Sequence, residues 1–133
     1  MKLLLDTHIW IWSLHDPAKL RPKVASALSH PKHELWLSPI SIWEVLLLIQ
    51  RGRLVVRGAD TPEKWVETAL STVPMQEAPV NNQVALRSRT VRVEHDDPAD
   101  RLLVATADVY DLTLVTADER LLSGRGYRTL ANR

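Results

Sequence analysis

The strongest constraint on the fold is the alternation of short apolar runs with segments of helical apolar spacing. Residues 2–5 (KLLL) are apolar without alternation, which is typical of a strand covered on both faces. Strands that alternate with helices through short connections predict an α/β protein with a mainly parallel sheet. The expected strands are residues 2–5, 35–37, 73–78, 112–115 and 127–130. The expected helices are residues 9–16, 21–29, 39–52 and 79–89, with others beginning near residues 61, 98 and 116.

The composition is that of an ordinary folded protein. The length of 133 residues predicts a single domain over residues 1–133. The absence of cysteine excludes a disulfide framework, a thiolate zinc site and a cysteine nucleophile. No apolar run approaches the ~18 residues of a membrane span, and Asp6 interrupts the N-terminal run too early for a signal peptide. We therefore expect a soluble, cytoplasmic protein with no membrane partner, and its net charge of +1 excludes neither nucleic acid nor an acidic partner.

Four acidic residues are expected to meet at one edge of this sheet. Asp6 and Asp118 follow expected strands, and Asp100 lies at the start of a helix. Glu44 lies on the helix that leaves the second strand. Because ligands of open parallel sheets bind outside the carboxyl ends of the strands, these four carboxylates are candidate site residues.

Most of these acids also have a purely structural explanation. Asp6 can cap the first helix, and Asp97 can cap the helix that carries Asp100. Thr116 has capping-box spacing to Glu119. A helix that starts there would place Asp118 in its first turn, where an acid is favourable. Each such cap contributes ~0.5–2 kcal/mol to stability without any chemistry.

Glu44 is harder to explain as a structural residue. It lies in a segment, residues 40–49 (ISIWEVLLLI), that is apolar on nearly every side and is therefore expected to be buried all round. No cation stands three or four positions away, and an unpaired buried carboxylate costs several kcal/mol. A distant arginine, or a solvent-facing stripe toward Arg51, is the alternative. The preferred interpretation is that Glu44 faces a polar cleft shared with the other acids.

Several carboxylates in one cleft repel each other unless protons or a cation intervene. Oxygen-only ligands favour Mg²⁺ or Mn²⁺ over zinc or copper. Since Mg²⁺ keeps waters and is commonly completed by substrate phosphates, the pattern indicates metal-assisted hydrolysis of a phosphate ester. Thr116 is expected to support the site by hydrogen bonding to a carboxylate or a water.

Basic and imidazole side chains add weaker signals. His8 stands two positions after Asp6 and is a further candidate, although the histidines show no metal-ligand spacing. Arg87, Arg89 and Arg92 form a cluster that is either a solvated face or a set of phosphate contacts near the cleft. The chain has neither a nucleophile elbow nor a glycine-rich phosphate loop.

The tryptophans divide into two groups. Trp36, Trp43 and Trp65 are expected in the core. Trp10 and Trp12 stand two apart on one helix and cannot both face fully inward. One of these two is therefore expected to be an exposed anchor for a partner.

Four segments in order resemble the PIN-domain family, and most closely its ribonuclease toxins of toxin–antitoxin pairs (the VapC type). They cover the chain nearly end to end and read LLLDTHIWIW, SPISIWEV, DPADRLLVATA and TLVTADERLL. The resemblance implies a three-layer α/β/α sandwich. It also implies an acidic quartet around Mg²⁺ or Mn²⁺, a small hydroxyl residue beside the fourth acid, and a further acid. These correspond to Asp6, Glu44, Asp100 and Asp118, to Thr116, and to Asp97.

The same resemblance implies an activity and partners. It implies cleavage of single-stranded RNA to a 5′-phosphate and a 3′-hydroxyl, homodimerisation, and inhibition by a small antitoxin. Two positions depart from the family pattern: Ala99 stands where a large apolar residue is common, and Glu119 is an alternative to Asp118 as the fourth acid. Two other functions stay open at this stage, namely a structure-specific DNA nuclease with the same metal site and a catalytically silent binding module whose acids are caps.

Overall fold

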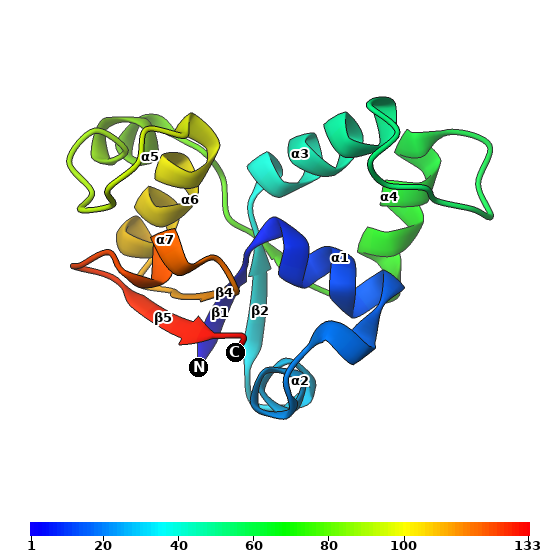
Figure 1. Ribbon diagram of the computed structural model, residues 1–133, viewed down its shortest axis with the longest axis horizontal. Coiled ribbons are helices and arrows are strands. Elements are labelled where there is room, and N and C mark those ends of the chain that lie inside the picture. The colour runs from blue at the N-terminus through cyan, green and yellow to red at the C-terminus, as the bar shows by residue number, and fades with distance from the viewer.

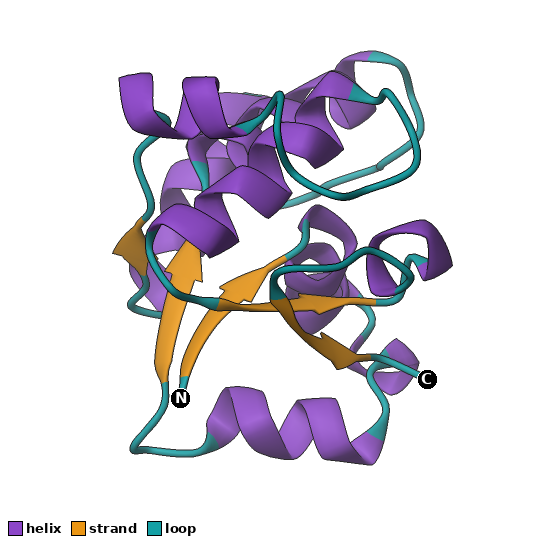
Figure 2. Cartoon of the chain, turned by 90° about the vertical axis from the view of Figure 1, so that its left-hand side faces the viewer, coloured by secondary structure: helices purple, strands orange, loops and turns teal.

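A computed structural model describes residues 1–133 as one all-parallel sheet with helices on both faces. The strand order is β3-β2-β1-β4-β5, and the strands turn progressively from one edge of the sheet to the other (Figure 2). The strands are β1 (Lys2–Leu5), β2 (Glu34–Leu37), β3 (Gln76–Glu77), β4 (Thr113–Thr116) and β5 (Arg128–Ala131). The helices are α1 (Thr7–His15), α2 (Pro22–Ser29), α3 (Pro39–Gln50), α4 (Pro62–Thr72), α5 (Asn82–Arg87), α6 (Pro98–Val109) and α7 (Glu119–Leu122), with a 3₁₀ turn η1 (Pro17–Lys19). The predicted α/β/α fold class is confirmed.

The central strand β1 divides the core into two halves. Leu3 and Leu5 point into a cluster formed with α1, α2, α3 and α4, whereas Leu4 points into a cluster formed with α6 and α7. Figure 1 shows α1, α3 and α4 on one side of the strands and α5 and α6 on the other. All three leucines are almost completely buried, as a strand covered on both faces requires.

Local sequence signals explain where several helices begin and end. Asp97 caps α6 and Pro98 is its first residue, as predicted. Gly52 has φ +70°, a conformation that favours glycine, directly after the last turn of α3. The predicted capping box is wrong, because Thr116 is the last residue of β4 and Asp118 caps α7.

Four expectations about extent and burial also need correction. The strand expected over residues 73–78 is only Gln76–Glu77, and the helix expected over residues 79–89 is only Asn82–Arg87. Helix α3 is not buried all round, since only Ser41 and Val45 are fully buried. Trp43 was expected in the core but is 53% exposed, because α3 packs through the opposite side of the helix.

The other tryptophans follow their predictions only in part. Trp10 is 1% exposed, and Trp12 is partly buried and packs against the core, so neither is the exposed anchor that was expected of this pair. Trp36 and Trp65 are partly buried and pack against the two core clusters. The helices are at most 12 residues long, and none has both the length and the apolar character that a membrane crossing requires.

Candidate active site

Four carboxyl groups that lie far apart in the sequence line a single pocket at the carboxyl edge of the sheet. The pocket has a volume of about 400 Å³. Asp6 directly follows β1, β4 leads to Asp118, and the first turn of α6 carries Asp100. Helix α3, which leaves β2, brings Glu44 across the top of α1. The lining residues are Asp6, His8, Trp12, Glu44, Asp97, Asp100, Ala117, Asp118 and Arg120.

Asp6 is the most firmly held of the four. It caps α1, with Oδ1 accepting from the backbone N–H of Thr7 at 2.7 Å. Its Oδ2 accepts from the hydroxyl of Thr116 at 2.6 Å, and the same hydroxyl accepts from the backbone N–H of Asp118 at 3.0 Å. Burial raises the pKa of Asp6, against the opposing effect of these hydrogen bonds. Capping and a site position are therefore compatible in one residue.

Glu44 has a neutral partner and no cationic one. Its Oε1 accepts from the hydroxyl of Thr7 at 2.7 Å, and that hydroxyl also lies 3.0 Å from Oγ of Ser41. No lysine, arginine or histidine forms an ion pair with Glu44. Burial raises the pKa of Glu44, and the charges of Asp6 and Asp97 raise it further. The alternative explanation, an ion pair between Glu44 and a distant arginine, is therefore wrong.

Asp100 combines partial burial with several acidic neighbours. Its backbone N–H donates to Oδ1 of Asp97 at 3.0 Å, which fixes the first turn of α6. Burial raises the pKa of Asp100 to about 7, and nearby carboxylates, Asp97 foremost, contribute to the rise. Nε2 of His95 lies 3.4 Å from Oδ2 of Asp100 but makes no hydrogen bond.

Asp118 differs from the other three because it has its own cation. It caps α7 and accepts from the backbone N–H of Arg120 at 2.9 Å, and the Arg120 guanidinium lies 3.0 Å from Oδ2. These hydrogen bonds lower the pKa of Asp118. Glu119, the alternative fourth acid, is exposed and pairs with Arg133 outside the pocket. Of the two acids, Asp118 is the one that lines the pocket.

The donor set suits a hard divalent cation. The pocket offers carboxylate oxygens, and burial raises the pKa values of three of its carboxyl groups, with neighbouring carboxylates adding to the rise. No three acidic or imidazole side chains stand close enough together to hold an ion directly. Mg²⁺ is commonly bound through one or two carboxylates while keeping several waters, so residues in this arrangement would hold it partly through water molecules.

The structure does not bring the arginine cluster to this pocket. Arg87 pairs with Asp108, and Arg87 and Arg92 line a separate hollow on the α6 side of the molecule. Arg89 is exposed and lines neither hollow. The cation at the pocket is instead Arg120.

Sequence reasoning missed three residues that shape the pocket. Thr7 holds Glu44, Arg120 pairs with Asp118, and Trp12 lines the wall together with the exposed His8. Thr7 and Arg120 each stand within two positions of a predicted site acid, so proximity to the strand ends was an available signal. Trp12 lies 5.9 Å from the ring of His8, one helical turn away.

The fold and the pocket define an α/β protein with a carboxylate site at the end of a parallel sheet. The model of the PIN domain matches residues 3–125. The chain is 32% identical over 126 residues to Ribonuclease VapC22 of Mycobacterium tuberculosis. The matched residues cover 92% of this chain and 92% of that protein. The chain therefore belongs to the PIN-domain family, in its VapC branch.

Solved structures share this fold at low sequence identity. The complex VapBC2 from Rickettsia felis bound to a promoter DNA fragment contains a chain that superimposes with a TM-score of 0.74 at 13% identity, covering 98% of both chains. A toxin–antitoxin complex from Klebsiella pneumoniae gives a TM-score of 0.65 at 20% identity, again covering 98% of both chains. These similarities extend over the whole sheet and both helical layers.

Proposed function

We propose that this protein is an endoribonuclease toxin that hydrolyses phosphodiester bonds in single-stranded RNA with the help of Mg²⁺ or Mn²⁺. The observation that carries the proposal is the pocket in which Asp6, Glu44 and Asp100 have no lysine or arginine partner. The 32% identity to Ribonuclease VapC22 supports RNA as the substrate. Asp118 completes the proposed acidic quartet, with Thr116 and Asp97 in supporting roles.

The chain's own residues have distinct tasks in this mechanism. Thr116 fixes the orientation of Asp6, and Thr7 fixes that of Glu44, so two carboxylates are held before any substrate arrives. Asp100 holds a proton for much of the time near neutral pH and must release it for a cation to bind. Asp6, Glu44, Asp100 and Asp118 would hold a metal ion, which would supply polarisation of the phosphoryl group and a lower pKa for a water molecule.

The proposed partners are a small antitoxin protein and a second copy of the chain. Structures of similar fold include VapBC complexes and another toxin–antitoxin complex, which supports an antitoxin partner. Homodimerisation is supported by the exposed Trp43, which lines an open hollow of about 690 Å³ between α3 and the start of α6. Ala99 lines the same hollow, where a larger side chain would fill part of it.

A direct assay tests the proposal. Purified protein with Mn²⁺ should cleave a single-stranded RNA oligonucleotide and spare a DNA oligonucleotide of the same sequence, and EDTA should stop the reaction. Preferential cleavage of the DNA would instead assign the site to a DNA nuclease. A silent binding module predicts no cleavage and no rise in melting temperature with Mn²⁺.

A cellular experiment tests the toxin role separately. Induced expression should arrest growth, and co-expression of the product of an adjacent short reading frame should restore it. Growth arrest that persists with Asp6→Asn would show that the toxicity does not come from the pocket.

A further inference from the structure

Two unpaired arginines face each other on the α6 side of the molecule. Arg92 and Arg125 form an isolated antiparallel bridge, in which the backbone N–H of Arg125 donates to the carbonyl of Arg92 at 3.0 Å. Gly124 permits this approach, because a Cβ at that position would lie 2.8 Å from the same carbonyl and overlap the hydroxyl of Tyr127. The close pairing of the two arginine backbones therefore depends on glycine at position 124.

This pairing places like charges opposite each other without compensation. Neither Arg92 nor Arg125 takes part in any of the seven ion pairs of the structure, and both are exposed. Directly opposite like charges on paired strands are destabilising. An anion between the two guanidinium groups would relieve that repulsion.

Hydrogen bonds from a buried arginine, Arg101, hold the segment that carries Arg92. The buried guanidinium of Arg101 donates to four carbonyls of this segment, those of Ser88 at 2.9 Å, Val93 at 3.1 Å, Val91 at 3.2 Å and His95 at 3.4 Å. A hollow of about 400 Å³ borders the pair and is also lined by Thr90 and Tyr127. A rigid backbone lowers the entropic cost of binding, since fewer groups become ordered when the ligand arrives.

Both segments lead back to the acidic pocket. Arg92 precedes Asp97 by five residues, and Arg125 follows Arg120 by five residues. Five residues span at most about 18 Å even when fully extended, so a strand of a few nucleotides in the pocket can reach the pair.

We propose that Arg92 and Arg125 bind a backbone phosphate of the RNA strand beyond the nucleotides that occupy the acidic pocket. The proposal rests on the proposed function. The planar guanidinium fork matches the geometry of phosphate oxygens, and continuity with the pocket favours a nucleic acid over an acidic peptide. Arg87 lines the same hollow but is already paired with Asp108, so it is not part of the site.

The test compares two double variants of equal net charge. Binding of a labelled single-stranded RNA of 12 nucleotides is measured in EDTA, which prevents cleavage, at several KCl concentrations. Arg92→Gln/Arg125→Gln should reduce the magnitude of the slope of log K against log[KCl] by about 0.7, because the two arginines share one phosphate and each lost single-strand phosphate contact removes about 0.7. If the two proteins bind equally at 1 M KCl, this slope difference makes the variant bind RNA about fivefold more weakly than wild type at 0.1 M KCl.

The control is Arg53→Gln/Arg57→Gln, which removes two exposed, unpaired arginines elsewhere. The control should keep the wild-type slope, and the Arg92/Arg125 variant should melt no lower than wild type because a repulsion is removed. Equal slopes in the two double variants would overturn the proposal. So would weaker binding of a polyglutamate peptide together with unchanged RNA binding. Failure of the wild-type protein to cleave RNA with Mn²⁺ would instead overturn the proposed function, since the binding assay does not depend on cleavage.

Discussion

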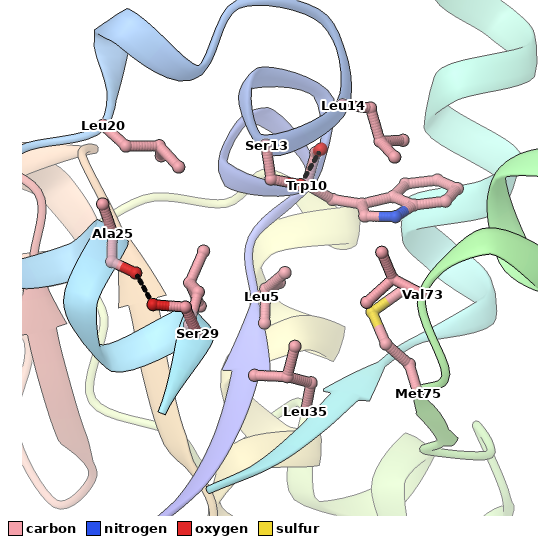
Figure 3. Close-up of a pocket in the computed structure, with 11 residues that line it drawn as sticks. Leu5, Trp10, Ser13, Leu14, Leu20, Ala25, Ser29, Leu35, Val73 and Met75 are labelled. Atoms are coloured by element: carbon pink, nitrogen blue, oxygen red, sulfur yellow. Dashed lines mark hydrogen bonds between the residues drawn. The ribbon is translucent and has the colours of Figure 1, made fainter. Parts of the chain in front are cut away.

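Two hollows on either side of α1 illustrate opposite uses of the same chain segment. One is the acidic pocket, which Asp6, His8 and Trp12 line from this segment. The other is an apolar hollow of about 220 Å³ lined by Leu5 and Trp10, where the indole Nε1 edge faces Val73 and Met75 (Figure 3). Adjacent residues at the end of β1, Leu5 and Asp6, therefore belong to opposite environments.

The two hollows differ in their effect on stability. Burial of apolar side chains such as Leu5 and Trp10 contributes roughly 1.5–3 kcal/mol each. Burial of the acids works against folding, as the raised pKa values of Asp6, Glu44 and Asp100 indicate. A chain selected for stability alone would not gather these carboxylates. The comparison predicts that apolar changes reduce stability with little effect on chemistry, and acidic changes the reverse.

The largest expected effect is on stability. Trp10→Ala removes an almost fully buried indole and should lower the free energy of unfolding by about 3–5 kcal/mol. Urea denaturation measures the loss, and activity per folded molecule should remain within threefold of wild type. Trp10→Phe should cost much less, because the indole N–H that it removes has no hydrogen-bond partner. A similar loss in both variants would contradict the account of this hollow.

The next effect is on catalysis. Asp6→Asn should lower kcat/KM for RNA by at least about 100-fold, or about 2.7 kcal/mol in the transition state. The urea midpoint should stay close to that of wild type, since the change replaces a buried acid by a neutral amide of the same shape. Asp60→Asn, an exposed acid outside the pocket, is the matched control. Equal activity of the two variants would remove Asp6 from the mechanism.

The third effect concerns pH in the metal-free protein. Asp100 has its pKa raised to about 7 by burial and by Asp97, Asp6 and Glu44, while His95 faces it from the preceding loop. The native state therefore binds more protons than the unfolded state between about pH 4 and 7. Stability in EDTA should fall as the pH rises through this window, on the order of 1–2 kcal/mol.

Thermal unfolding from pH 5 to 8 measures this dependence. Mn²⁺ should flatten it, because a cation stabilises the ionised form of the carboxylates. Asp100→Asn should make it less steep without any metal, with the raised pKa values of Asp6 and Glu44 accounting for what remains, whereas Asp60→Asn should leave it unchanged. A pH dependence as steep in Asp100→Asn as in wild type would assign it to other groups.

The sequence predicted the sheet and the positions of its terminal acids because both depend on local signals. The continuous apolar run of β1 and the acid, proline and acid at the start of α6 are readable without tertiary information. Parallel strands then bring their carboxyl ends to one edge, which is why Asp6 and Asp118 line the same pocket.

Features that depend on packing between distant segments were not predictable. Glu44 was singled out on the premise of a helix buried all round, yet α3 exposes Trp43, and the partner of Glu44 is a hydroxyl 37 residues away. Arg87 lies away from the pocket because of the way α5 packs against α6. The residues around Arg87 give no local signal of that packing. A cluster of charged residues in the sequence shows which charges are present. Only the tertiary structure shows which side chains lie next to them.

The smallest expected effect tests the boundary between the two environments at β4. Thr116 is completely buried, and its hydroxyl links Asp6 to the backbone of Asp118. Thr116→Val keeps the volume and the strand preference but removes both hydrogen bonds, so RNA cleavage should fall about 10-fold, as is typical of a lost partner of a metal ligand. Thr116→Ser should retain most activity.

The control for this change lies on the same strand. Thr113 is also buried, but its hydroxyl makes no hydrogen bond within the chain, and Thr113→Val should leave cleavage unchanged. Isothermal titration with Mn²⁺ separates the causes, because weaker metal binding in Thr116→Val alone would place the loss at the orientation of Asp6. If Thr116→Val and Thr113→Val change RNA cleavage equally, the hydroxyl of Thr116 is not what positions Asp6. The effect of β4 on cleavage would then come from burial of its side chains and not from hydrogen bonding.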